Sequence, residues 1–217
     1  NGFVGLKPYH VFSSNIPTQD SAIEEFLTEQ HVRVAHEERL TITLHIVRQR
    51  ALADKQNQAT IRRYATKYPD MRLILAHLAR GFNPHHTIEG IVGLTGLSNV
   101  YFDTSATADP GASEAIVLSM GHNTLLFGSD FPISYQRGRP IAMGDDFTWL
   151  RPQNLPIGGG KGDDAITAYA VSGGQPRQTI NGIESLRSLK VGAMSLKLTD
   201  SQIEDIFYNN AARLLGI

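Results

Sequence analysis

The sequence contains no cysteine among its 217 residues. This absence excludes disulfide bonds, thiolate nucleophiles and cysteine-based zinc sites, so a metal site must use histidine and carboxylate ligands. An excess of charge is also lacking, because Lys and Arg together number 20 and Asp and Glu 21, a net charge of −1. We therefore expect no basic surface that binds nucleic acid or an anionic membrane.

Long apolar runs are absent as well: none approaches the roughly 18–20 residues that span a bilayer. The sequence shows no signal-peptide pattern. Together with the lack of cysteine, this favours a cytoplasmic enzyme. The apolar fraction, 41%, is ordinary, and the length is sufficient to bury the core of a single domain that covers residues 1–217.

Five short runs of apolar, β-branched or aromatic residues predict buried strands. They are residues 3–7, 40–45, 71–77, 100–103 and 125–130. Helical periodicity lies between them, and the capping box Thr199–Gln202 predicts the start of the last helix. This alternation indicates an α/β fold with a parallel sheet covered by helices.

One stretch, residues 133–184, breaks the alternation because it is rich in Gly, Pro and Asp. Its composition predicts a long loop after the last strand. We interpret it as an insertion within the domain that covers the mouth of a pocket, as a lid.

Each predicted strand ends in a polar residue: Lys7, His45, His77, Asp103 and Asp130. In a parallel α/β barrel the C-terminal ends of the strands open on the same face, where active sites form. We therefore expect these side chains to converge on one pocket. Neutral imidazole and carboxylate groups are good ligands for zinc and also suit manganese.

Simpler interpretations exist for single members of this set. A lone buried histidine at a strand end is more often structural, and we interpret Asp103 as the cap of a turn. Lys7 either extends to solvent or meets a substrate carboxylate. Asp130 needs a metal or a cation, since a buried carboxylate without a partner is costly. Ordinary surface positions are expected for five other histidines, namely His31, His36, His85, His86 and His122.

Six motifs together resemble the amidohydrolase-related branch of the amidohydrolase superfamily, which contains metal-dependent hydrolases and decarboxylases. They are "GLKPYH", "LTITLHIV", "LILAHLARGFNP", "NVYFDTSA", "LLFGSDFP" and "IFYNNAARLLG". The resemblance implies a TIM-type (β/α)₈ barrel, of which this chain supplies about strands 4 to 8 with their helices. It implies that His45 and Asp130 bind a divalent metal, zinc or alternatively manganese. Asp130 is then also a proton acceptor, and His77 a catalytic residue that positions water or substrate.

Two departures from the family pattern matter. Arg80 replaces a glycine that is common there, and it either pairs bidentately with a substrate carboxylate or is a solvated loop residue. The His-x-His motif of the family's first strand is absent, although such barrels typically have about 250 residues. We therefore expect the chain to be the C-terminal part of a longer protein that needs the preceding strands. Homo-oligomer formation is left open.

Three functions remain in competition. The leading hypothesis is a metal-dependent hydrolase of a small amide, ester or lactone-like substrate. A decarboxylase of a small aromatic or unsaturated acid would use the same residues, and an inactive C-terminal fragment is the third alternative. A strand with His-x-His in the preceding coding sequence would favour an enzyme over the inactive fragment.

Overall fold

The computed structural model describes residues 2–150 and 179–217 of the chain. Its central element is a five-stranded parallel sheet in which the strand order follows the sequence. The strands are β1 Gly5–Leu6, β2 Thr41–Leu44, β3 Arg72–Leu75, β4 Val100–Asp103 and β5 Leu125–Leu126. All five predicted strands are confirmed, and all except β4 are shorter than the apolar run that predicted them. Among the described residues β1 and β5 each pair with a single strand, so the sheet is open at both edges.

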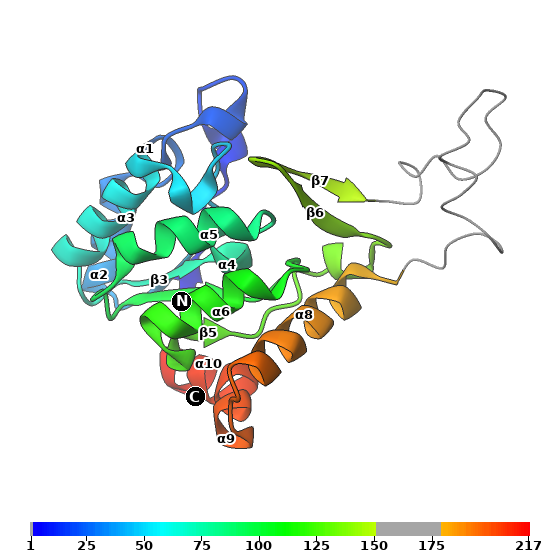
Figure 1. Ribbon diagram of the computed structural model, residues 1–217. Helices are drawn as coiled ribbons and strands as arrows, with labels where there is room; N and C mark the ends of the chain where they lie inside the picture. Colours follow the sequence, from blue (N-terminus) through cyan, green and yellow to red (C-terminus); the bar gives the residue numbers. More distant parts are fainter. Residues whose placement is uncertain (1, 151–178) are drawn as a thin grey trace, which may run out of the picture.

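Helices follow the strands as the alternation predicts. They are α1 Ile23–Phe26, α2 Glu29–Glu37, α3 Lys55–Lys67, α4 Ala76–Arg80, α5 Pro84–Gly90, α6 Pro110–Met120 and α8 Asn181–Ser195. Helix α6 packs against both α5 and α8, and Figure 1 shows these three helices across one side of the sheet. The described part of the chain contains no helix long and apolar enough to cross a membrane.

The core lies between the sheet and these helices. The inward-facing strand residues are at most 1% exposed: Ile42, Leu44, Leu73, Leu75, Val100, Phe102 and Leu125. Tyr64 and Ile61 of α3 are buried in the same cluster. Burial of these apolar side chains is the main force that holds the sheet to its helices.

The C-terminal segment is tied to the edge of the sheet by an asparagine. It consists of α9 Asp200–Glu204, a π-helical turn Asp205–Asn209 and α10 Asn210–Leu215. The predicted capping box is confirmed, since Thr199 and Gln202 exchange hydrogen bonds at the start of α9. Asn210, 2% exposed, donates through Nδ2 to the carbonyl oxygens of His122 and Leu125 at 2.9 and 2.8 Å.

A β-hairpin occupies part of the stretch that was predicted to be a loop. Strands β6 Arg139–Met143 and β7 Asp146–Leu150 pair antiparallel, and Met143 lies opposite Asp146. The loop prediction is wrong here because Gly144, with φ 60°, and Asp145 form a two-residue hairpin turn. Residues 151–178, the rest of the expected lid before α8, lie outside the described residues.

Candidate functional site

All five residues expected at the site line one cavity of about 560 Å³: Lys7, His45, His77, Arg80 and Asp130. They come from segments that follow β1, β2, β3 and β5. The cavity therefore lies at the C-terminal ends of the parallel strands. Of the five residues expected to converge from the strand ends, Lys7, His45, His77 and Asp130 line the cavity and Asp103 does not. Position alone does not give the chemical roles of the residues that line it.

His77 and Asp130 are not the last residues of strands, as the apolar runs had suggested. Strand β3 ends at Leu75, and the next turn, α4, is left-handed: His77, Leu78, Ala79 and Arg80 have φ between 52° and 59°. Asp130 also has a positive φ, 51°. Such backbone costs about 1–2 kcal/mol for each residue with a side chain. The left-handed turn brings both His77 and Arg80 to the cavity.

His77 is held on both its backbone and its ring. Its backbone N–H donates to Oδ1 of Asp103 at 3.1 Å, and Nδ1 lies 2.9 Å from Oγ of Ser105. Asp103 Oδ1 also accepts from the backbone N–H and the hydroxyl of Ser105, which confirms its predicted turn-capping role. Because Nδ1 is engaged, Nε2 is the ring atom that remains for a ligand in the cavity.

His45 lies beside His77, with ring centroids 5.0 Å apart in an edge-to-face arrangement. Its Nδ1 is buried and has no hydrogen-bond partner in the described part of the chain. Burial, followed by electrostatic interactions with His77 and Arg80, lowers the pKa of His45 to about 3. The imidazole is therefore neutral near pH 7, which is the form that binds a metal.

His10 is a third histidine of the cavity, and the sequence analysis missed it. Its ring centroid lies 5.8 Å from that of His45, and its Nδ1 lies 3.0 Å from Oγ1 of Thr18. Burial, followed by the charge of Arg80, lowers the pKa of His10. The available signal was its position three residues beyond Lys7, just after the first strand.

Arg80 is a partly buried cation. Its Nη1 donates to the carbonyl oxygen of Arg48 at 2.6 Å, and its Nη2 to Oε1 of Gln19 at 3.2 Å. Burial lowers the pKa of Arg80, an effect that the charge of Asp146 opposes. No carboxylate of the described residues lies within ion-pair distance of its guanidinium. The guanidinium is thus held by neutral acceptors and is only partly exposed, and its role as a substrate ligand stays a prediction.

The two remaining members of the predicted set differ in exposure. Lys7 is exposed, and its ammonium lies 5.5 Å from the ring centroid of Tyr9. Asp130 is half-buried, and its carbonyl oxygen accepts from the backbone N–H of Ile133 at 2.7 Å. Both Asp130 and Lys7 are lining residues of the cavity.

An aromatic wall, formed by Phe82, Phe147 and Trp149, closes one side of the cavity. The ring centroid of Phe82 lies 5.0 Å from that of Phe147 and 5.3 Å from that of Trp149. Phe82 also stacks on His77, at 5.2 Å and an interplanar angle of 30°. Two of these three residues belong to β7, so the hairpin is part of the site.

The donor atoms fit part of a metal site. His45, whose buried Nδ1 has no partner among the described residues, and Asp130 line the same cavity, and imidazole and carboxylate are both ligand types for zinc. Among residues 2–150 and 179–217, no group of three or more His, Asp or Glu side chains could hold an ion. A zinc site normally takes at least three protein ligands, so the described residues supply an incomplete set.

The expectation that five other histidines are ordinary surface residues is wrong for His86. This side chain is 2% exposed, and its Nε2 lies 3.1 Å from Oδ1 of Asp145 at the tip of the hairpin. The burial of His86 was not predicted because the hairpin whose tip contacts it was not predicted. His31 and His85 are exposed, as expected.

Comparisons with known proteins point to one family. The family model described as Amidohydrolase matches residues 1–217. A crystal structure of an amidohydrolase from Burkholderia multivorans with bound HEPES is 15% identical, with a TM-score of 0.56, over 99% of this chain and 65% of that chain. A second structure of a Burkholderia multivorans amidohydrolase, with bound zinc, gives 15% and 0.55 over 98% and 64%.

A hydratase shares the same fold. The crystal structure of 4-oxalomesaconate hydratase from Rhodopseudomonas palustris is 13% identical, with a TM-score of 0.51, over 99% of this chain and 56% of that chain. The chain therefore spans less than two thirds of the length of these structures. No curated protein matches it.

Proposed function

We propose a function from the premise that this chain belongs to the amidohydrolase family, whose model matches it from residue 1 to 217. Its open parallel sheet is part of a TIM-type α/β barrel. We propose that the complete protein is a metal-dependent hydrolase that directs water at a small amide, ester or lactone-like substrate. The observation that carries this proposal is that Asp130 lines the same cavity as His45, whose buried Nδ1 has no partner in the described part of the chain.

His45 and Asp130 would be two ligands of a divalent ion, zinc or alternatively manganese. When bound, such an ion lowers the pKa of water toward 7. The zinc in the Burkholderia multivorans structure supports this choice of metal. The missing ligands would come from strands that precede β1, because the described residues contain no complete set.

Four side chains of this chain would act on water and substrate. The carboxylate of Asp130 would accept the proton of the attacking water, the role of a general base. Nε2 of His77 would orient that water or a substrate oxygen, since Ser105 and Asp103 hold the rest of the residue. The cations of Arg80 and Lys7 would bind a carboxylate of the substrate.

Decarboxylation of a small aromatic or unsaturated acid is the second candidate. A specific feature favours it: the aromatic wall lies beside Arg80, whose guanidinium is 5.6 Å from the ring centroid of Phe147. An unsaturated acid has both a charged group for Arg80 and a flat apolar part for the wall. The same Asp130 and His77 would then move the proton that replaces the lost carboxylate.

The test is to assay the full-length protein, with the sequence that precedes this chain, on panels of both substrate types. Hydrolysis is followed by proton release at constant pH and decarboxylation by carbon dioxide release. We expect turnover of small lactones or esters, and its loss in an Asp130→Asn variant. Carbon dioxide release without hydrolysis would select the second candidate. Inactivity on both panels, in protein that holds its metal, would contradict the proposal.

A further inference from the structure

The tip of the β6–β7 hairpin is fastened to the body of the protein by hydrogen bonds. Asn83, which is fully buried, donates through Nδ2 to the carbonyl oxygens of Gly144 and Asp146 at 3.1 and 3.0 Å. Its own Oδ1 accepts from the backbone N–H of His85 and caps α5. One side chain therefore fixes the start of α5 and the turn of the hairpin relative to each other.

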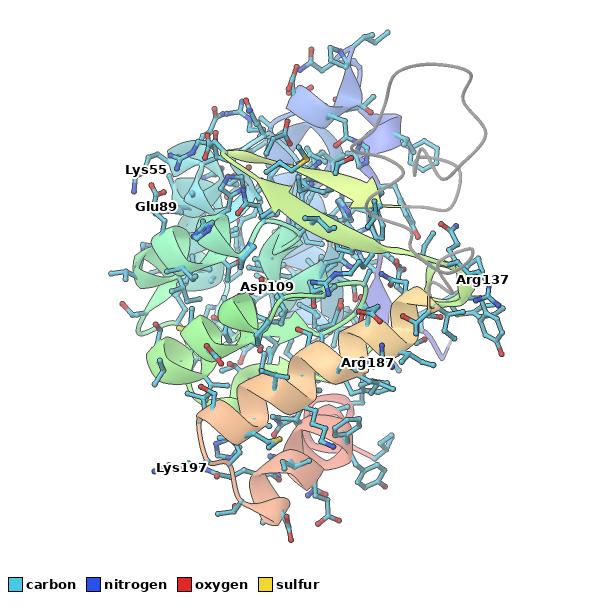
Figure 2. The ribbon with its side chains drawn as sticks, turned by 45° about the vertical axis from the view of Figure 1, so that its right-hand side comes forward. Lys55, Glu89, Asp109, Arg137, Arg187 and Lys197 are labelled. Carbon is cyan, nitrogen blue, oxygen red and sulfur yellow. The ribbon has the colours of Figure 1, made fainter. Side chains whose placement is uncertain are left out.

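Charged groups hold the same tip. Nε2 of His86 donates to Oδ1 of Asp145 at 3.1 Å, and Nε of Arg50 lies 3.2 Å from Oδ2 of Asp145. Arg50 also pairs with Glu89 of α5, which Figure 2 shows on the same side of the molecule as the tip. The hydrogen bond from His86, and then that from Arg50, keep the pKa of Asp145 below its ordinary value. We call Asn83, Arg50, His86 and Asp145 the tip clasp.

The clasp and the cavity are connected by β7. Asp145 lies in the turn directly before β7, and Phe147 and Trp149 alternate along β7, so these two rings point to the same face of the hairpin. Figure 1 shows the hairpin running from beside the start of α8 toward the N-terminal part of the chain, where its tip lies. A shift of the tip would move the aromatic wall relative to Arg80 and His77.

We propose that the tip clasp positions the β6–β7 hairpin as the apolar wall of the substrate site, and that this wall selects substrates with a flat, unsaturated part next to a carboxylate. Phe147 and Trp149 are then specificity-determining residues, and Asn83, His86 and Asp145 are positioning residues. The inference shares one assumption with the proposed function, namely that this cavity binds the substrate.

The geometry explains the preference for a flat substrate. Aromatic rings attract other flat π-systems in offset or edge-to-face arrangements, beyond the gain from burying apolar area. The guanidinium of Arg80 lies 5.6 Å from the ring centroid of Phe147, so a carboxylate bound by Arg80 has the wall next to it. A saturated ring of the same size could use the charge but could not stack.

Ligand binding can be measured without catalysis because Trp149 is the only tryptophan of the chain. The probes are benzoate, cyclohexanecarboxylate and benzamide, added to the metal-free full-length protein while Trp149 fluorescence is followed. We expect benzoate to bind about three- to tenfold more tightly than cyclohexanecarboxylate, the effect of an aromatic pair. Benzamide, which lacks the charge, should bind about tenfold more weakly than benzoate.

Equal affinities for the three probes, or no response to benzoate, would overturn the proposal. A Trp149→Phe variant assigns the signal to this residue. Phe147→Leu should remove most of the preference for benzoate over cyclohexanecarboxylate, whereas Tyr208→Leu, an exposed aromatic outside the cavity, should leave it unchanged. Because no metal or turnover is involved, failure of the hydrolase proposal would not affect these results.

The clasp is tested with a matched pair of aspartates. Asp145 and Asp70 both face a histidine, and their side chains are 59% and 57% exposed, but Asp70 pairs with His36 away from the cavity. We expect Asp145→Ala to weaken benzoate binding about threefold or more and to make Trp149 more accessible to acrylamide. Asp145→Asn keeps an oxygen acceptor for His86 and Arg50 and should restore most of the affinity.

Asp70→Ala should change neither benzoate binding nor the quenching of Trp149. Thermal unfolding of each variant separates positioning from stability, because a purely structural role would lower Tm without changing the ratio of benzoate to cyclohexanecarboxylate affinities. If Asp145→Ala alters this ratio no more than Asp70→Ala does, the clasp does not position the wall.

Discussion

The backbone N–H of His77 donates to the carboxylate of Asp103, across adjacent strands, at 3.1 Å. Ser105 joins the same two residues, because its hydroxyl donates to Asp103 and lies 2.9 Å from Nδ1 of His77. Asp103 was predicted to be a structural residue, and in this arrangement it holds His77, a residue of the candidate site, in place.

The first prediction concerns the hydrogen bonds that the carboxylate of Asp103 accepts from His77 and Ser105. Asp103→Asn keeps an oxygen that accepts from the N–H groups of His77 and Ser105, so we expect a small loss of stability. Asp103→Ala leaves the buried N–H of His77 without a partner, which costs about 1–3 kcal/mol. Urea unfolding of both variants measures the difference. Equal stability of the two variants would show that these hydrogen bonds contribute little.

The second prediction concerns the left-handed backbone of Arg80, whose φ is 58°. Glycine adopts this conformation without the strain that a side chain causes, so Arg80→Gly should be about 1 kcal/mol more stable than Arg80→Ala. Arg213, in the right-handed helix α10, provides the control. There alanine should be the more stable replacement, by about 0.5–1 kcal/mol. The same order at both positions, measured by urea unfolding, would contradict the left-handed turn.

The third prediction follows from the pKa of His45, which is lowered from 6.5 to about 3. As the pH falls from 6.5 toward 3, the unfolded chain binds a proton that the folded chain excludes. The free energy of unfolding therefore falls in this window, by up to about 1.4 kcal/mol per pH unit, and is unaffected above it. The groups around His45 that disfavour its protonation are His77, Arg80 and His10.

His45→Asn removes this titration, so in metal-free protein its stability should decrease less steeply between pH 6.5 and pH 4 than that of the wild type. Urea unfolding across this range measures both slopes. His31→Asn, which changes an exposed histidine, is the control and should keep the wild-type slope. A His45→Asn variant with the wild-type slope would show that His45 titrates normally in the folded protein.

The fourth prediction concerns proton transfer in the full-length enzyme. Asp130→Asn keeps the shape of the side chain but removes its basicity, so turnover should fall about a hundredfold or more. His77→Ala should also lower turnover while bound metal stays nearly unchanged. Steady-state kinetics and metal analysis of the same samples test both statements. Near-normal turnover of Asp130→Asn would show that Asp130 is not the general base. Loss of metal from His77→Ala would show that His77 is a metal ligand.

The central strands were predictable because one face of each is fully buried and the residues of the other face are at most partly exposed. Residues such as Ile42, Leu73 and Phe102 are at most 1% exposed. In an α/β protein, short apolar runs of this kind usually form strands of a buried parallel sheet. The left-handed turn was not predictable, since Leu78 and Ala79 are residues that favour right-handed helices. Contacts made elsewhere in the chain override that local preference.

The charged and histidine residues of the site were predictable because polar side chains stand out at the ends of apolar runs. Polar residues after apolar runs identified His45, His77 and Asp130, and the cavity contains all three. The aromatic wall had no such signal, because Phe147 and Trp149 resemble ordinary core residues in sequence. The burial of His86 was missed for another reason. It depends on the β6–β7 hairpin, which was not predicted and whose strand β6 contains a proline, Pro140.

The most direct test of the account is the divalent metal bound by the full-length protein, measured per chain for the wild type and for His45→Ala and Asp130→Ala. His85→Ala, an exposed histidine outside the cavity, is the control. The account predicts zinc or manganese in the wild type and in the control, and the loss of most of it in the other two variants. A wild-type protein that is free of metal yet fully active, or unchanged metal in the His45 and Asp130 variants, would contradict it.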